Sequence, residues 1–156
     1  MLSLLAYPLA LALATGPCDL VDKAAASSLL GAPVTTVTPS GPAPDEDTGG
    51  TMSSCVYQAG DRMLVVVRVD YPTAAAARDA ATEEMSPEKL AEEGTTATPE
   101  SGLGDKAWLA HTKYGLQYSV LKGASALSLA IGGMPKDLSS YETQLRAATA
   151  AAVKKL

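Results

Sequence analysis

Hydrophobic and polar positions alternate with a period of two over much of the chain, which is typical of strands with one buried face. The last third is the most regular: residues 106–112, 115–122 and 124–131 form three such segments separated by short turns. The same pattern predicts earlier strands at residues 34–38, 51–59 and 62–71, and a short one at 95–98.

The segment 62–71 is the clearest of these strands. One of its faces is apolar throughout: Met63, Val65, Val67, Val69 and Tyr71. The other face mixes charged and apolar side chains: Arg62, Leu64, Val66, Arg68 and Asp70. Because both faces carry apolar residues, we expect a central strand that is covered at least in part on both sides.

Three segments have helical character instead. Residues 23–30 follow Asp22, a good N-cap, and end at Gly31, which can adopt the left-handed conformation of a helix end. Residues 73–93 are rich in Ala and Glu, and Pro87 splits them because the residue before a proline disfavours helix. The final helix repeats apolar residues at three- and four-residue spacing: Leu138, Tyr141, Leu145, Ala148, Ala152 and Leu156.

The order helix, three strands, helix, several strands, helix predicts the α+β class. Short turns join most strands, so we expect a mainly antiparallel sheet with about three helices packed mostly on one face. Residues 39–50 are rich in Pro, Gly and Asp and are predicted to form a loop, the most mobile part of the chain.

Composition narrows the classes of function. The 156 residues suit one domain, and 47% hydrophobic with 19% charged residues is a globular balance. The formal charge of −5 argues against binding nucleic acid, because neutralising phosphates requires clustered Lys and Arg. The chain has no Phe and a single Trp, Trp108, so Ala, Val and Leu must build most of the core.

Residues 1–14 read as a signal peptide, which leaves residues 15–156 as a single α+β domain. Positions 2–14 are uncharged and mostly Leu and Ala, and they end in small-x-small patterns that signal peptidase accepts. The stretch is too short for a transmembrane helix, so we expect an extracytoplasmic mature chain without a membrane span. No Lys or Arg follows Met1, which leaves open an atypical signal, a start codon placed slightly late, or a buried N-terminal helix or strand.

Two cysteines, Cys18 and Cys55, follow the signal. An even count after an export signal predicts one disulfide, which would close a loop of about 38 residues and stabilise the fold by about 4 kcal/mol. Lipidation of Cys18 is the alternative. It is disfavoured because Pro17 stands where a lipoprotein signal needs a small residue, and because Cys55 would be left unpaired.

Candidate chemistry is sparse, and we assign no catalytic, cofactor-binding or metal-binding residue. The single histidine, His111, has no anchored partner in the sequence, and the acidic runs lack the register of a calcium loop. The most distinctive stretch is residues 102–108. There Gly102 and Gly104 suit a turn that needs positive φ, and Asp105 could accept hydrogen bonds from turn amides.

Four short segments together carry a resemblance: residues 17–20, 29–31, 55–57 and 102–108. The pattern resembles a family of small exported actinobacterial lipoproteins and sensor-like domains of unknown function. The resemblance implies that a Cys before the first helix pairs with a Cys on an early strand, and that a Gly-Leu-Gly-Asp-x-Ala turn opens the later hairpins. It supplies no catalytic residues, and Pro17 departs from the lipobox of such lipoproteins.

Three hypotheses follow for function. The first is a non-catalytic cell-envelope module that binds a small apolar ligand or a partner protein. The second is a cell-wall-associated enzyme, which requires polar groups such as Ser53, Ser54, His111 and Tyr114 to meet in one cleft. The third is a structural or inhibitory domain that acts through its surface.

Overall fold

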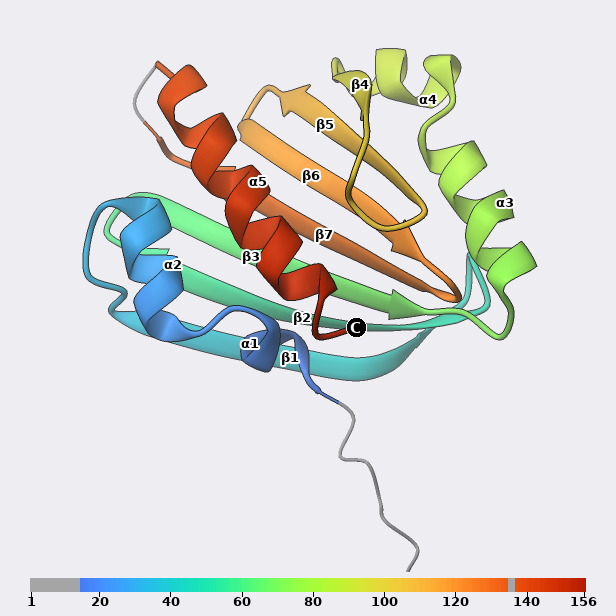
Figure 1. Ribbon diagram of the computed structural model, residues 1–156, viewed down its shortest axis with the longest axis horizontal. Helices are drawn as coiled ribbons and strands as arrows, with labels where there is room; N and C mark the ends of the chain where they lie inside the picture. The colour runs from blue at the N-terminus through green and yellow to red at the C-terminus, as the bar shows by residue number, and fades with distance from the viewer. Residues whose placement is uncertain (1–14, 135–136) are drawn as a thin grey trace, which may run out of the picture.

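The computed structural model describes residues 15–134 and 137–156. Its centre is one seven-stranded sheet in the order β1-β2-β3-β7-β6-β5-β4, and every neighbouring pair is antiparallel (Figure 1). The strands are β1 Thr36–Asp45, β2 Gly50–Ala59, β3 Arg62–Asp70, β4 Thr96–Glu100, β5 Lys106–Thr112, β6 Gly115–Lys122 and β7 Ser125–Gly132. The helices are α1 Pro17–Leu20, α2 Lys23–Leu30, α3 Ala74–Glu84, α4 Pro87–Glu92 and α5 Ser139–Val153. The predicted α+β class is therefore confirmed.

Local sequence signals place the ends of the helices. The Asp22 carboxylate accepts a hydrogen bond from the Ala25 amide at 2.8 Å, and α2 ends at Gly31 in the left-handed conformation with φ 64°. Pro87 opens α4, as predicted, and the Ser86 side chain caps that helix. In the described part of the chain, no helix has the length and apolarity needed to cross a membrane.

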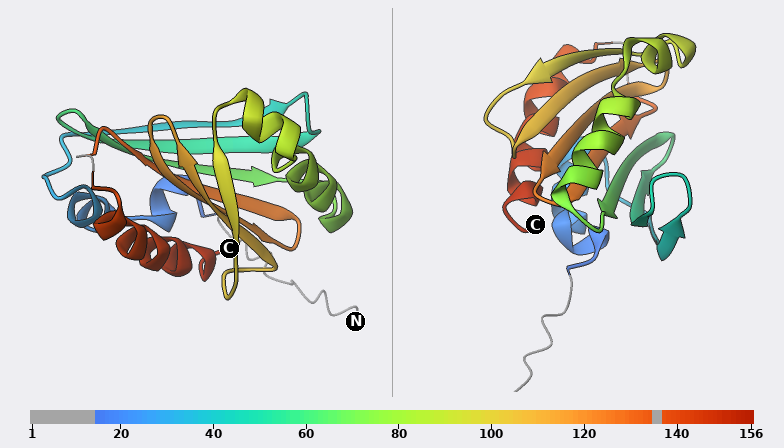
Figure 2. Two further views of the ribbon diagram at one scale, coloured as in Figure 1. Left: turned by 90° about the horizontal axis from the view of Figure 1, so that it is seen from above. Right: turned by 90° about the vertical axis from the view of Figure 1, so that its right-hand side faces the viewer.

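One face of the sheet carries the main core, beneath α1, α2 and α5 (Figures 1 and 2). Leu30 of α2 and Leu145 of α5 are fully buried against Leu64, Tyr118 and Leu129 of the sheet. Each fully buried leucine contributes about 2 kcal/mol of hydrophobic stabilisation. This face therefore provides most of the rigidity of the domain.

The opposite face is only partly covered. Helix α3 packs over β6 and β7, where Ala77 and Leu121 are buried, and α4 packs beside β4. The remainder of this face, below called the open face, has no helix over it in the described residues (Figure 2). The prediction that most helices lie on one face is confirmed, and so is the expectation that β3 is a central strand, since it lies between β2 and β7.

The predicted loop at 39–50 is wrong over its first half. Strand β1 runs through Pro39 and Pro44 to Asp45, and only the turn at 46–49 remains irregular. Proline is tolerated because β1 is an edge strand, where a missing N–H removes no hydrogen bond to β2. The pairing shifts between Ser40 and Ala43, and this bulge accommodates the rest of the Pro/Gly-rich run.

Candidate functional site

The two cysteines lie at the junction of α1 and β2. The Sγ atoms of Cys18 and Cys55 are 2.07 Å apart and form a disulfide, with their Cα atoms 5.2 Å apart. The hydroxyl of buried Tyr57 donates to the carbonyl oxygens of Cys18, at 2.9 Å, and of Val21. This cluster anchors the N-terminal segment to the main core and lies on the face opposite the open face.

The 102–105 turn joins β4 to β5. Gly102 and Gly104 both have positive φ, 77° and 56°. A Cβ atom on Gly104 would lie 2.5 Å from the Leu121 carbonyl oxygen, so the backbones of the two segments touch there. The Asp105 carboxylate accepts a hydrogen bond from the Gly123 amide at 2.6 Å. The turn is thereby attached to the β6–β7 turn, and a structural role for it remains our prediction.

The four polar residues that an enzyme would need are not brought together. Ser53 and Ser54 lie on β2, where successive side chains point to opposite faces of the sheet. His111 lies on β5 and Tyr114 in the turn that follows it. Three strands separate β2 from β5, a distance of about 19 Å at roughly 4.8 Å per strand. These residues cannot line one cleft.

A cleft of about 300 Å³ lies between α3 and the sheet, at the border of the open face. Its floor includes the second half of the apolar β3 face, Val67, Val69 and Tyr71, and its helix-side wall includes Ala81 and Met85. All three floor residues are half-buried, whereas Leu64 and Val66, on the other face of β3, are fully buried in the core. The volume is within the range of small-molecule sites.

A second cleft of about 450 Å³ continues along the same face. Met63 and Val65, the first half of the apolar β3 face, line it together with exposed Tyr114. Gln117 lines both clefts, so they adjoin at the middle of the sheet. We call the two clefts together the trough. Its floor is the apolar row that alternation marked in the sequence: Met63, Val65, Val67, Val69 and Tyr71.

A short polar row crosses the middle of the trough. The Gln117 side-chain amide donates to the Ser119 hydroxyl at 3.0 Å, and the Ser119 and Ser128 hydroxyls are 3.2 Å apart. Ser128 also donates to the Tyr118 carbonyl at 3.3 Å. These groups face the first cleft while bonded mainly to one another, so they offer a bound molecule polar contacts at little desolvation cost.

The end of the first cleft next to α3 is acidic. Asp45, at the end of β1, and Glu84, at the end of α3, both line it. Burial raises the pKa of the Tyr71 hydroxyl, and the two carboxylates raise that pKa further, while a hydrogen bond with Thr48 acts in the opposite direction. Among the described residues, no group of three His, Cys, Asp or Glu side chains is arranged to hold a metal ion.

Trp108 of β5 is half-buried and lines the first cleft. It also faces the neighbouring hollow beneath α4, with Met85 and Leu90. Because Trp108 is the single tryptophan of the chain, tryptophan fluorescence reports on this one position, at the boundary of the cleft and the hollow. The sequence marks this residue and the apolar β3 face, but not the cleft, because the cleft depends on how α3 packs over β6 and β7, which come much later in the chain.

Comparisons with known proteins show likeness of fold. The chain matches no protein-family model and no curated protein. The extracellular domain of PknH from Mycobacterium tuberculosis is similar with a TM-score of 0.54 and 13% identity, covering 88% of this chain and 94% of that chain. An uncharacterised protein from Mycobacterium smegmatis, an Rv0999 ortholog, matches with a TM-score of 0.39 and 14% identity over 85% of this chain and 97% of that chain.

At 13% identity, the first of these likenesses concerns the fold alone. The sheet and helices of this chain thus have the arrangement of a mycobacterial extracellular domain. No family is identified by the comparisons.

Proposed function

We propose that this protein is an exported, non-catalytic module of the cell envelope that binds a small, largely apolar ligand in the trough. The observation that carries the proposal is the apolar β3 face. Its side chains line the two clefts, and Met63 is 40% exposed although it lies on a central strand. Apolar surface left open beside a covered core is typical of a binding site.

Export is supported by two observations and by one expectation from the sequence. A disulfide joins Cys18 to Cys55, and disulfides persist in oxidising compartments. The fold is similar to that of an extracellular domain. The expected signal peptide at residues 1–14 lies outside the described residues, and its removal, leaving one domain from residue 15, is part of the proposal.

A binding role is favoured over catalysis because the polar groups are dispersed. His111 is exposed on β5, and the serines of β2 are three strands away. The two serine hydroxyls that face the trough, those of Ser119 and Ser128, have no histidine or carboxylate as a hydrogen-bond partner among the described residues. Such hydroxyls can orient a ligand but lack a base to activate them.

The proposal is tested by titrating the protein with dodecyl maltoside, an uncharged amphiphile, below its micelle concentration. We expect a saturable change in Trp108 fluorescence, because the probe enters the cleft that Trp108 lines. Val67→Arg should abolish the change by placing a charged side chain on the floor. Val37→Arg is the control, since Val37 is an exposed valine of β1 that lines neither cleft.

A second measurement separates loss of binding from loss of folding. Both variants should show a single cooperative urea transition with the native circular dichroism spectrum. Equal responses from Val67→Arg and the unaltered protein, or no response from the unaltered protein, would contradict the proposal.

A further inference from the structure

We infer that the ligand of the trough carries a positively charged head group, seated at Asp45 and Glu84, on an apolar body that lies over the β3 face. The inference rests on the proposed function, because it names the class of ligand for the same site. It is argued from charge complementarity at one end of the first cleft.

Asp45 is the first of the two acidic groups. Its carboxylate accepts hydrogen bonds from the Thr48 hydroxyl at 2.7 Å and the Asp47 amide at 3.2 Å. Both donors are neutral, and no cation pairs with Asp45 among the described residues. The residue is half-buried in the cleft wall, where a negative charge without a cationic partner attracts one from the ligand.

Glu84 is the second acidic group, and it comes from a different element. It lies on the last turn of α3 and lines the cleft on the helix side. Lys89 forms an ion pair with Glu84, but Lys89 lines the neighbouring hollow and not this cleft. An exposed pair of this kind is weak, and a carboxylate has room for a second cationic donor.

The remaining walls suit a cation with an apolar tail. None of the described residues lining the first cleft is Lys, Arg or His, so an anionic head would meet only negative charge. Two aromatic rings, Tyr71 and Trp108, line the cleft, and such rings attract ammonium groups. The second cleft holds Lys113 and Glu93, one charge of each sign, and so does not favour an anion.

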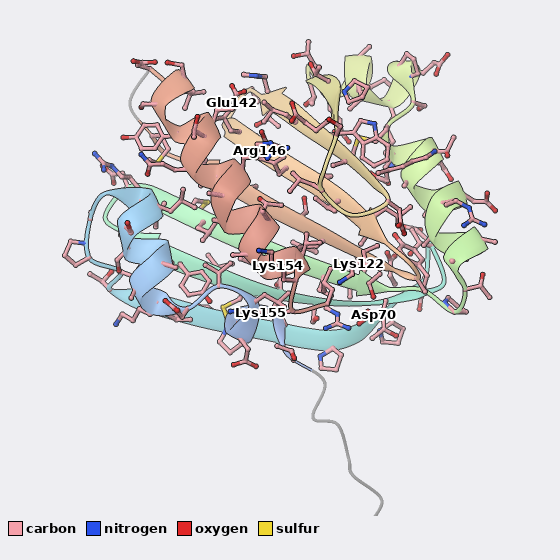
Figure 3. The ribbon with its side chains drawn as sticks, in the orientation of Figure 1. Asp70, Lys122, Glu142, Arg146, Lys154 and Lys155 are labelled. Carbon is pink, nitrogen blue, oxygen red and sulfur yellow. A yellow bond between two sulfur atoms is a disulfide. The ribbon has the colours of Figure 1, made fainter. Side chains whose placement is uncertain are left out.

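Several basic side chains are bound elsewhere, on the other face of the sheet. Lys122 donates to the Val153 carbonyl at 2.9 Å, and Lys155 donates to the Asp19 and Leu20 carbonyls at 3.0 Å. Figure 3 shows Lys122, Lys154 and Lys155 gathered around the carboxyl end of α5. These cations stabilise helix ends. Among the described residues, Lys89 is the one cation that pairs with a carboxylate at the acidic end of the trough, and Asp45 has no cationic partner there.

The test compares three probes that each have a linear chain of twelve carbons, counting the carboxyl carbon of the third: dodecyltrimethylammonium, dodecyl maltoside and dodecanoate. Each is titrated below its micelle concentration at low salt, with Trp108 fluorescence as the readout. We expect the cationic probe to bind most tightly and dodecanoate most weakly. We define the preference as the Kd of the uncharged probe divided by the Kd of the cationic probe. This ratio should fall by roughly three- to fivefold in Glu84→Gln.

Two further variants complete the design. Asp45→Asn should lower the same preference. Its one amide oxygen can still accept from Thr48, whereas the contact of the Asp47 amide with the other carboxylate oxygen is lost, so a urea transition checks that the variant is folded. Glu46→Gln is the matched control, because Glu46 is an exposed acid of the same turn that does not line the cleft. It should leave the preference unchanged, and added salt should reduce the preference in the unaltered protein.

The outcomes distinguish this inference from the proposed function. Equal binding of all three probes, or tightest binding of dodecanoate, would overturn the cationic head group while leaving an apolar ligand site in place. Failure of every probe to bind would overturn both. If Glu46→Gln lowers the preference for the cation as much as Glu84→Gln does, the effect comes from general surface charge and the inference is overturned.

Discussion

The carboxylate of Asp105 accepts a hydrogen bond from the backbone amide of Gly123, 2.6 Å away and eighteen residues later in the chain. The Asp105 amide in turn donates to the Leu121 carbonyl at 2.7 Å. Asp105 thus holds the turn before β5 against the hairpin that joins β6 to β7. The most distinctive stretch of the sequence, residues 102–108, therefore connects the turn before β5 to the β6–β7 hairpin.

Removing the Asp105–Gly123 hydrogen bond should therefore lower the free energy of unfolding and leave amphiphile binding by the folded protein unchanged. We expect Asp105→Ala to lower the free energy of unfolding by about 0.5–2 kcal/mol, because the Gly123 amide loses its acceptor. Asp105→Asn, which keeps an acceptor oxygen, should cost less. Urea titration measures the effect. An Asp105→Ala protein of unchanged stability that no longer binds amphiphiles would contradict the structural role.

Gly104 lies in close contact with Val120 and Leu121 of β6, and a larger side chain at this position tests that contact. Gly104→Ala should destabilise by about 1 kcal/mol for the positive φ and more for the clash with Leu121 and Val120. Gly123→Ala is a matched control, because Gly123 has φ 59° but nothing within 4 Å of an added Cβ. The difference between the two variants in thermal unfolding isolates the clash. Equal losses would show that backbone conformation alone matters.

Much of the architecture follows from local signals. Asp22 and Gly31 delimit α2, Pro87 separates α3 from α4, and alternation over residues 106–132 produces the three hairpin-linked strands. Each of these signals depends on residues that are close together in the chain, so the sequence alone is sufficient to predict the elements that they delimit. The start of β1 lies within the strand predicted at residues 34–38, but its continuation over residues 39–45 does not follow from the sequence. Proline penalises a strand unless the strand lies at an edge, and edge position is a property of the whole sheet.

The trough could not be predicted for a related reason. A period of two assigns side chains of β3 to two faces but does not say which face the core takes. Leu64 and Val66 are buried because α5, some seventy residues later, packs with α1 and α2 on their side of the sheet. The more uniformly apolar face of β3, from Met63 to Tyr71, therefore lines the trough.

The disulfide gives a prediction about the N-terminal anchor. Thiol labelling of unreduced, denatured protein should find no free cysteine. Replacing Cys18 and Cys55 together with Ala should lower stability by about 4 kcal/mol, because the unfolded chain is no longer cross-linked. Two labelled cysteines in the unreduced protein would exclude the bond in solution.

Tyr57 predicts how stability depends on pH. Burial raises its pKa above the ordinary value of 10.0, and the carboxylates of Asp22 and Asp19 raise it further. The unfolded state then loses its proton first as pH rises, so this contribution is complete below pH 10 and is lost above it. Urea unfolding between about pH 8 and 11 should show the decline.

Tyr57→Phe is the matched variant for that pH series. It should be less stable at neutral pH by about 1–3 kcal/mol, because the Cys18 and Val21 carbonyls lose their donor. Its stability should fall less steeply at alkaline pH. An alkaline decline as steep as that of the unaltered protein would assign the effect to other groups, such as Tyr71 and Tyr118, whose pKa values burial also raises.

The central claim, that a ligand lies over the apolar face of β3, is tested most directly by methyl NMR of a valine-labelled sample titrated with dodecyltrimethylammonium or dodecyl maltoside. Val65, Val67 and Val69 line the trough, whereas Val66 of the same strand is fully buried on the other face. We predict large shift changes and intermolecular contacts for the three odd-numbered valines and almost none for Val66. Changes confined to other surfaces, or spread equally over both faces of β3, would contradict the account.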